Sequence, residues 1–493
     1  MFPVATCTDG AAKSKRAPRR KMWRSRVQNV AFEANCTNES FVERCSRCAS
    51  TQTLRLVDLA GYAPRSMATP IRRLGLLDVL AIGVNAIVGS GVFSMPDDMH
   101  RAMGGWSPLA FLFCALLLMP VALSFAELAG TSDETGGPYL YARKAFGPMV
   151  GFIVGWSSWL NAFISWAANT TLFVALCGVD SPLLQKALVL VTIVALGVIN
   201  YVGVRPGALV IHVMVFGKVT AIVCFVAVAL LAAHPGHLAG ALPHAFAGVG
   251  NGVYLALFPL QGFEVVPVPA GEAKNPERNV PLGTMGSLLF AAVLFVVVQA
   301  VMERSYPDIG IESLTPLVDA ARHLGPKIGT IVFIGSIVSI GGFTAGSALG
   351  APRYAQAISE HGQLPSALSR IHTRFQTPHV AIVTTTLLTA VLGVFFDYRS
   401  LVGFSNVTVV FQYALTCIAV PVLRRKAKAT APPLADEPAV RRFKIPGGPI
   451  LPIAGAVGSV ALLYGSSFVE LLIAAGAIGI GYPLALGARR LAG

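Results

Sequence analysis

The chain contains twelve apolar segments, each near the ~20 residues that an α-helix needs to cross a bilayer. Only 13% of its 493 residues are charged, against about 25% in soluble domains. These features predict an all-α polytopic membrane protein with twelve transmembrane helices. We place the centres of the spans at residues 76–93, 108–126, 150–176, 187–202, 208–233, 249–270, 282–302, 328–350, 380–396, 401–423, 450–464 and 468–486.

The first and the sixth of these segments are interrupted where a membrane helix should be continuous. The first interruption covers residues 89–91, and the second lies around Pro259 and Gly262. Unwound backbone at membrane depth leaves amide and carbonyl groups unpaired, and it survives only where it lines a cavity or is buried in protein. Interrupted spans in the two halves of a chain indicate the binding site of a secondary transporter. The pattern therefore predicts that broken helices 1 and 6 share one site.

The first break carries groups suited to an anion. Gly89 and Gly91 lack a Cβ, so the backbone can leave helical geometry and approach a ligand closely. The amides that follow begin a half-helix, whose N-terminus favours negative charge. With the Ser90 hydroxyl as a further donor, we expect a carboxylate to bind here. The competing interpretation is a close crossing of two helices, which also uses small residues.

The second break carries groups suited to a cation. Pro259 donates no backbone hydrogen bond, and Gly262 loosens the next turn. Carbonyl groups near Phe258 and Gln261 are then free to accept from an ammonium group, and the Phe258 ring can face a cation or an apolar side chain. Two breaks of opposite polarity predict a small zwitterion. Pro259 as a kink relieved by neighbouring helices is the alternative interpretation.

Two ionisable residues lie at membrane depth. Lys218 is thirteen residues beyond Arg205, or ~20 Å along a helix, which is deep for a lysine that snorkels to the interface. Glu264 directly follows the second break. Charged groups inside a membrane usually face the bundle interior and mark ion or proton paths. We therefore expect Lys218 and Glu264 to couple transport to protons, with snorkelling as the alternative for Lys218.

The basic residues predict the orientation of the chain. With the start of the first span inside, the inner loops hold nineteen Lys and Arg, and the outer loops hold six. The positive-inside rule then places both termini in the cytoplasm. We expect a multi-pass protein of a plasma membrane or a bacterial inner membrane.

Residues 1–70 differ in composition from the rest of the chain, with twelve Lys and Arg and no apolar run long enough to span. This basic tail is interpreted as a disordered cytoplasmic extension, as a targeting peptide, or as sequence upstream of a true start at Met67. The predicted organisation continues with a transporter core at 71–425, a basic loop at 426–446 and the last two spans at 447–493.

Several classes of function find no support in the sequence. There is no phosphate-binding Walker motif, no nucleophile motif such as GxSxG, and no pattern of metal ligands. The net charge of +14 comes from short loops and the tail rather than from a basic face interleaved with aromatics. We therefore predict that the protein is not an enzyme, and that it uses no cofactor, metal or nucleic acid.

Four sequence motifs span most of the chain after the tail. They are VGSGVF at 88–93; ELAG at 127–130 with TGGPYLYARKAFGP at 135–148; GFE at 262–264 with GEAKNPERNVP at 271–281; and APRYAQAISEHGQLP at 351–365 with TP at 377–378. In sequence and in order, these motifs resemble those of amino acid permeases of the amino acid–polyamine–organocation superfamily.

The resemblance implies a core of two inverted five-helix repeats plus two further helices, with alternating access around a site between spans one and six. By position, it assigns substrate-binding roles to Ile87, Ser90, Gly91, Phe258, Gln261 and Asn169. Lys218 falls where proton-coupled relatives carry a lysine in place of a bound sodium ion, so protons are favoured over sodium.

The sequence departs from the family pattern at the second break. Pro259 replaces a small residue and Leu260 replaces an aromatic residue. We expect a secondary active transporter of amino acids, working by symport or exchange. A polyamine or amine transporter of the same fold and a transport-inactive amino acid sensor are the alternatives. The particular substrate and the oligomeric state are left open.

Overall fold

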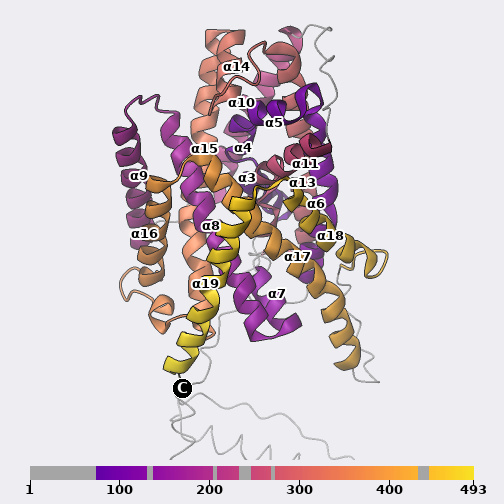
Figure 1. The fold of residues 1–493 in the computed structure, drawn as a ribbon, viewed down its shortest axis with the longest axis vertical. Helices are drawn as coiled ribbons and strands as arrows, with labels where there is room; N and C mark the ends of the chain where they lie inside the picture. Colours follow the sequence, from indigo (N-terminus) through magenta and orange to yellow (C-terminus); the bar gives the residue numbers. More distant parts are fainter. Residues whose placement is uncertain are drawn as a thin grey trace, which may run out of the picture. The chain divides into compact units, whose positions relative to one another are not determined.

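The structure is a computed structural model, and it describes residues 74–129, 137–203, 208–232, 246–267, 273–430 and 443–492 (Figure 1). All of these belong to the second of the two units of the chain, Pro70–Gly493. The predicted tail at 1–70 and residues 431–442 of the predicted basic loop lie outside the described residues.

The described part of the chain is helical, and its only β-type pairing is one isolated parallel bridge between Leu74 and Ala273. The α-helices are α3 (Leu76–Ile87), α4 (Gly91–Ser94), α5 (Pro96–Met103), α6 (Pro108–Ala129), α7 (Gly137–Phe146), α8 (Pro148–Ala175), α9 (Pro182–Val202), α10 (Ala208–Ala232), α11 (Phe246–Leu255), α12 (Leu257–Leu260), α13 (Pro276–Ser305), α14 (Pro316–Leu324), α15 (Pro326–Glu360), α16 (His379–Phe395), α17 (Tyr398–Thr430), α18 (Ile450–Leu462) and α19 (Phe468–Ala492). Short 3-10 turns are η1 (Gly104–Trp106), η2 (Phe263–Val265), η4 (Ser366–Ser369) and η5 (Leu463–Gly465).

Proline and glycine set many of the helix ends. The helices α8, α9, α13 and α15 all have proline at their first position, where the missing N–H costs nothing and the fixed φ suits a helix. Gly203 ends α9 in the left-handed conformation, with φ 90°, and its amide closes back onto the carbonyls of Ile199 and Asn200. These are local signals, readable from the sequence.

Eight described helices are long and apolar enough to cross a membrane, and α16 and the segment Ile450–Gly465 are shorter apolar helices. The chain is therefore a multi-pass membrane protein, as predicted. Helix α8 and the broken segment α11–α12 are not among these apolar spans. Helix α8 is rich in polar and aromatic residues, but Trp166, Asn169 and most of its other side chains are buried inside the bundle. The count of twelve and the inverted repeat stay predictions.

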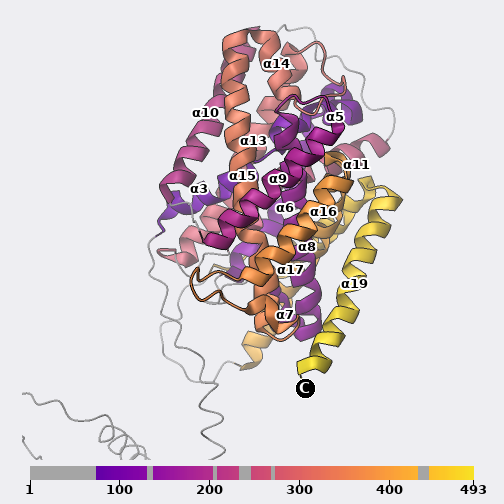
Figure 2. The ribbon, with the colours of Figure 1, turned by 90° about the vertical axis from the view of Figure 1, so that its left-hand side faces the viewer.

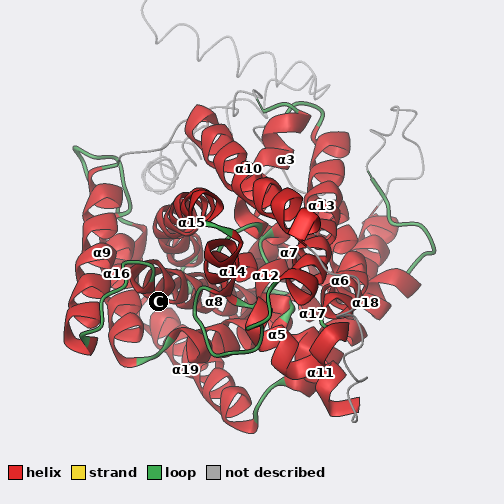
Figure 3. Cartoon of the chain, turned by 90° about the horizontal axis from the view of Figure 1, so that it is seen from above, coloured by secondary structure: helices red, strands yellow, loops and turns green. Residues whose placement is uncertain are grey.

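Burial separates the central helices from the peripheral ones. In the first span, Leu76–Ser94, 61% of the most apolar stretch of 18 residues is buried inside the protein. The corresponding buried share of α9 is 17%. Helix α8 packs against α15 and α17, and α13 packs against α3 and α6. Viewed from above, α9 and α16 lie at one edge of the bundle (Figure 3). Peripheral helices therefore turn apolar side chains outward, as contact with lipid requires.

The bundle has two ends that serve as landmarks. Helix α7 and the C-terminus lie at one end, called the α7 end, and α14 and α5 lie at the opposite end, called the α14 end (Figures 1 and 2). The two broken helices run between these ends, and their interruptions position the site.

Candidate functional site

The first span leaves helical geometry after Ile87, where α3 ends. Val88 has φ −77° and ψ 76°, and the helix resumes at Gly91. The amide of Met95 then bonds to the carbonyl of Gly91 at 3.0 Å, so α4 leads on into α5. Ser90 and Gly91 therefore begin a new helical piece, whose first amides have no acceptor on their own helix.

Side chains from two other helices reach the carbonyl groups that this break exposes. On α10, Lys218 Nζ donates to Val88 O at 2.8 Å and to Asn85 O at 3.4 Å, and the lysine is fully buried. On α15, Ser339 Oγ lies 3.1 Å from Val88 O and 3.0 Å from Gly89 O. The C-terminal end of a helix carries partial negative charge. The predicted coupling lysine thus lies on the natural cation-binding end of α3.

The second break follows α12, a single turn that contains Pro259. The amide of Gln261 donates to Leu257 O at 3.1 Å and only at 3.4 Å to Phe258 O. The backbone then becomes extended at Gln261, and Gly262 has φ 117°. Only glycine takes such a conformation without steric cost. The carbonyl of Phe258 therefore keeps much of its capacity to accept another hydrogen bond.

The two breaks are in direct contact. A Cβ on Gly91 would lie 2.6 Å from the Cβ of Pro259, and one on Gly262 would lie 2.5 Å from Ala86 O and 2.9 Å from Ile87 N. Because no side chain fits at either glycine, the two backbones can approach this closely only with glycine at both positions. The structure thus brings together Ile87, Gly91, Pro259 and Gly262, as expected for one shared site.

A buried group of amides and hydroxyls, here called the amide cluster, joins the second break to α8 and α17. Gln261 Nε2 donates to Asn406 Oδ1 at 2.8 Å, and Ser405 Oγ lies 2.7 Å from Asn161 Oδ1 and 3.3 Å from Gln261 Oε1. Ser165 completes the amide cluster at 2.9 Å from Ser405. Of these five residues, sequence reasoning selected only Gln261 for the site, because side-chain partners depend on how the helices are rotated.

Asn169 does not take part in the amide cluster. Its Nδ2 donates to Ser165 O on its own helix at 2.7 Å, and its buried Oδ1 has no partner among the described residues. Asn161, eight residues earlier on α8, is the asparagine that reaches toward Gln261 through Ser405. The presence of two asparagines in a predicted span was the available signal, and it did not distinguish Asn161 from Asn169.

Glu264 is buried directly beyond the second break. Its carboxylate accepts from the Gly262 amide and from the Tyr413 hydroxyl, both at 2.8 Å. Within the described part of the chain it forms no ion pair. The carboxylate therefore holds the unwound backbone at Gly262 in place, and it is also a buried acidic group beside the site.

Tyr398, on the first turn of α17, lies over the first break. Its hydroxyl is 2.7 Å from Ser94 Oγ and 3.5 Å from Ser90 Oγ. Its ring meets the Phe258 ring edge to face, with centroids 6.2 Å apart. One side chain therefore connects both breaks on their α14 side, and sequence reasoning missed it.

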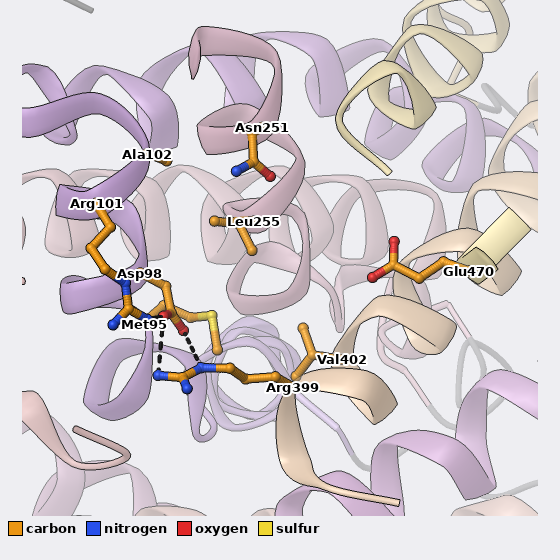
Figure 4. Close-up of a pocket in the computed structure, with 9 residues that line it drawn as sticks. All are labelled: Met95, Asp98, Arg101, Ala102, Asn251, Leu255, Arg399, Val402 and Glu470. Carbon is orange, nitrogen blue, oxygen red and sulfur yellow. Dashed lines mark hydrogen bonds and ion pairs between the residues drawn. The ribbon is translucent and has the colours of Figure 1, made fainter. Parts of the chain in front are cut away.

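A set of ion pairs lies beside Tyr398 at the α14 end. Arg399 pairs with Asp98 of α5 at 3.2 Å, and Arg101 pairs with the same Asp98. Figure 4 shows these three side chains together. Arg399 also pairs with Glu312. These contacts tie α17 to the half-helix that follows the first break. They cover the α14 side of the breaks with charged groups.

Further contacts anchor α5 to the end of α13. His100 Nδ1 lies 2.8 Å from the buried carboxylate of Glu303, which also accepts from Ser107 Oγ. Asp97 accepts from the Gly310 amide at 3.3 Å. The hydrogen bond to Glu303 raises the pKa of His100, and burial raises the pKa of Asp97 to about 6. Protonation of His100 therefore strengthens its contact with Glu303, whereas protonation of Asp97 removes the cost of burying its charge.

On the α7 side of the breaks, contacts with neighbouring segments hold the start of α3 in place. His212 Nε2 on α10 lies 2.8 Å from Asp78 Oδ1, and the Lys274 amide donates to Leu74 O at 2.8 Å. The segment before the first span thus pairs with the segment after the second break. Both sides of the breaks are closed by contacts between separate helices.

The chemistry available at the breaks is binding rather than bond making. Unpaired amides suit an anion, exposed carbonyls suit a cation, and the described residues hold no group of three or more His, Cys, Asp or Glu that could ligate a metal. The prediction of a site for a small dipolar solute is consistent with these groups.

Known proteins resemble this chain over most of its length. The amino acid permease family model matches residues 74–479. The branched-chain amino acid permease BcaP of Bacillus subtilis is 28% identical, covering 77% of this chain and 85% of the relative. The serine/threonine exchanger SteT of the same organism is also 28% identical, covering 81% and 91%. Mouse cationic amino acid transporter 4 is 27% identical, covering 79% and 66%.

The resemblance seen in the four motifs is thereby confirmed over residues 74–479, and these relatives are transporters rather than enzymes. This chain belongs to the amino acid permease family of the amino acid–polyamine–organocation superfamily.

Proposed function

We propose that the chain carries small amino acids across a membrane by alternating access around its two helix breaks, and that proton binding at Lys218 drives the transport. The observation that carries this proposal is the 2.8 Å contact between Lys218 Nζ and the carbonyl of Val88. Family membership supports amino acid transport, and the remaining steps are argued from the breaks.

The substrate would bind by its two charged groups. Its carboxylate meets the amides of Ser90 and Gly91 and the Ser90 hydroxyl, at the start of a helical piece. Its ammonium group meets the carbonyls of Ile87, Phe258 and Gln261. Supporting this, the breaks touch at Gly91 and Pro259, so both sets of groups lie within the reach of one small molecule.

Lys218 would link proton binding to the shape of the first break. A protonated amine stabilises the carbonyl end of α3 through charge and hydrogen bonding. Loss of the proton removes that charge and weakens the tie between α10 and the break. Glu264, buried beside Gly262, is proposed as a second group that takes part in proton movement.

Alternating access requires the two closures to open in turn. We assign the α7 end to the cytoplasm, in line with the nineteen inner and six outer basic residues. The ties at Asp78 and His212 would then close the cytoplasmic side, and those at Asp98 and Arg399 the outer side. Both termini are cytoplasmic in this proposal, and the host is a plasma membrane or a bacterial inner membrane.

The test is uptake into proteoliposomes with and without an inward proton gradient. We expect the parent chain to accumulate its substrate under the gradient, and Lys218→Met to exchange substrate without responding to it. Lys186→Met removes an exposed lysine from α9 and serves as the matched control. Proton dependence that is equal in the parent and in Lys218→Met contradicts the coupling role.

The substrate is identified in the same vesicles with radiolabelled solutes. The panel contains serine, threonine, branched-chain and basic amino acids, and polyamines. Uptake of amino acids supports the proposal, and uptake of polyamines alone favours the amine transporter. A parent chain that moves none of them, even in counter-exchange, contradicts the proposed transport.

A further inference from the structure

A cavity of about 280 Å3 lies at the α14 end, between α5, α11, α17 and α19 (Figure 4). Its size is close to the lower limit of small-molecule sites, which span ~300–1,000 Å3. Met95, at the start of α5, and Leu255, at the end of α11, belong to the half-helices on the α14 side of the two breaks. The cavity therefore adjoins the breaks without being part of them.

Opposite charges line opposite sides of this outer pocket. Figure 4 shows Asp98, Arg101 and Arg399 on one side and Glu470 on the other, with Leu255 and Val402 between them. The two arginines share the carboxylate of Asp98. A pocket with charges arranged in this way matches a molecule that carries one positive and one negative group.

Glu470 has an unbalanced charge. Its carboxylate accepts hydrogen bonds from the Tyr254 hydroxyl and the Ser467 amide, both at 3.0 Å, and it pairs with no Lys, Arg or His in the described ranges. Part of this bonding caps the start of α19, which accounts for one oxygen. The other oxygen faces Gly403 of α17, where a side chain would collide with it. The acid is thus held beside the pocket with capacity for a cation.

We propose that the outer pocket is a second binding site, which takes up a zwitterionic α-amino acid before it reaches the breaks. The ammonium group lies toward Glu470 and the carboxylate lies toward Arg101 and Arg399. The bound carboxylate competes with Asp98 and Glu312 for Arg399. Occupation of the pocket therefore loosens the tie between α5 and α17, and this prepares the outer side to open.

This inference relies on the proposed function for the nature of the ligand, so the experiment measures occupation of the pocket separately from transport. Ala102 lines the pocket and is replaced by cysteine in a background in which Cys177, Cys224 and the four cysteines of the tail (Cys7, Cys36, Cys45 and Cys48) are serine, so that only the buried Cys114 and Cys417 remain. The purified full chain is labelled with a charged methanethiosulfonate reagent. The probes are L-serine and L-isoleucine, each also as the N-acetyl derivative and the methyl ester.

We expect the free amino acid that is transported to slow labelling at Ala102→Cys about tenfold at ten times its Kd. The N-acetyl and ester forms lack one charge and do not protect. Asp308→Cys, an exposed position in the loop before α14, is the matched control, and its labelling does not change. Protection by the ester alone would mean that the pocket recognises a cation only, and it overturns the zwitterion site.

A Gly91→Val variant separates the pocket from the breaks. The added side chain would collide with Pro259, so this variant loses uptake, whereas protection at Ala102→Cys persists if the pocket binds by itself. Loss of protection in this variant overturns the inference. If amino acids protect Ala102→Cys but the parent chain transports none of them, the proposed function is contradicted and the second site is still supported. The failure of one proposal can therefore be told apart from the failure of the other.

A Glu470→Gln variant provides a readout that does not depend on Gly91→Val. We expect it to raise the amino acid concentration that half-protects Ala102→Cys by roughly three- to tenfold, as expected for one partly exposed charge contact. Asp308→Asn is the matched control, and it leaves the half-protecting concentration unchanged. An equal half-protecting concentration in the parent and in Glu470→Gln overturns the second site.

Discussion

The Lys218 amine lies 2.8 Å from the carbonyl oxygen of Val88, although 130 positions separate the two residues in the chain. Val88 is the first residue beyond α3, so this contact joins α10 to the point where the first span unwinds. The buried amine donates a hydrogen bond there to a carbonyl at the end of α3 that has no partner within its own helix. The consequences of this arrangement can be tested at the surrounding residues.

Ser339 is predicted to hold the same carbonyls in position for Lys218. Replacing it with alanine removes the one hydroxyl donor that Val88 O and Gly89 O share, and it slows proton-driven uptake about fivefold, since one such bond is worth ~1 kcal/mol. Ser336→Ala is the control, because Ser336 is equally buried on α15 and bonds only to Phe333 of its own helix. Initial rates that fall equally in both variants count against this role.

Gly262 is predicted to tolerate no side chain. Its φ of 117° disfavours alanine, and the added methyl group would overlap Ala86 O. Gly262→Ala therefore lowers the thermal unfolding midpoint in detergent. It also reduces uptake at least about tenfold, which corresponds to a loss of ~1.4 kcal/mol of substrate binding free energy. Gly346→Ala, in an open part of α15, retains both properties. A Gly262→Ala protein with parental uptake contradicts the close contact of the breaks.

Glu127 is predicted to stabilise the fold without contributing to coupling. Its carboxylate binds Arg424 through two oxygens, at 2.7 and 2.6 Å, and also accepts from the Ile445 amide. Glu127→Gln leaves Arg424 without its charge partner, which costs about 3 kcal/mol for a largely buried pair. Denaturant or thermal unfolding measures the loss, with exposed Glu360→Gln as control. A change in proton dependence without a loss of stability argues for a different role.

The anchoring of α5 is predicted to depend on pH. The raised pKa values of His100 and Asp97 mean that the folded state binds these protons more tightly than the unfolded state. Their stabilisation is present at low pH and is lost as pH rises through the raised values, about 6 for Asp97. Amide hydrogen exchange in α5, corrected for intrinsic rates, should therefore be slower near pH ~5 than near pH ~8.

The His100→Asn variant checks the histidine's share of this effect. Asparagine still donates to Glu303 but does not titrate near neutral pH, so the difference in exchange between acidic and basic conditions becomes smaller. Exchange in α16, which packs against α8 and α9 at the edge of the bundle, provides the internal reference. Protection of α5 that increases with pH would contradict the assigned direction.

Local chemistry made much of the helical fold predictable. The apolar segments indicated membrane helices, and proline and glycine marked many of their ends. The positions of both breaks could be read from Gly91, Pro259 and Gly262, because the geometry that these residues permit or forbid depends on their own covalent structure. The polytopic class and the family resemblance are confirmed, whereas the span count and the coupling role of Lys218 stay predictions.

The partners of the site residues were decided only by the tertiary structure. Asn161 rather than Asn169 joins Gln261, and Ser405, Asn406 and Tyr398 were not foreseen. Such contacts link positions hundreds of residues apart and depend on the rotation and depth of each packed helix. Sequence patterns describe which residues a helix contains and where it stops. Packing against other helices determines which of its side chains meet, and thus which polar groups surround the breaks.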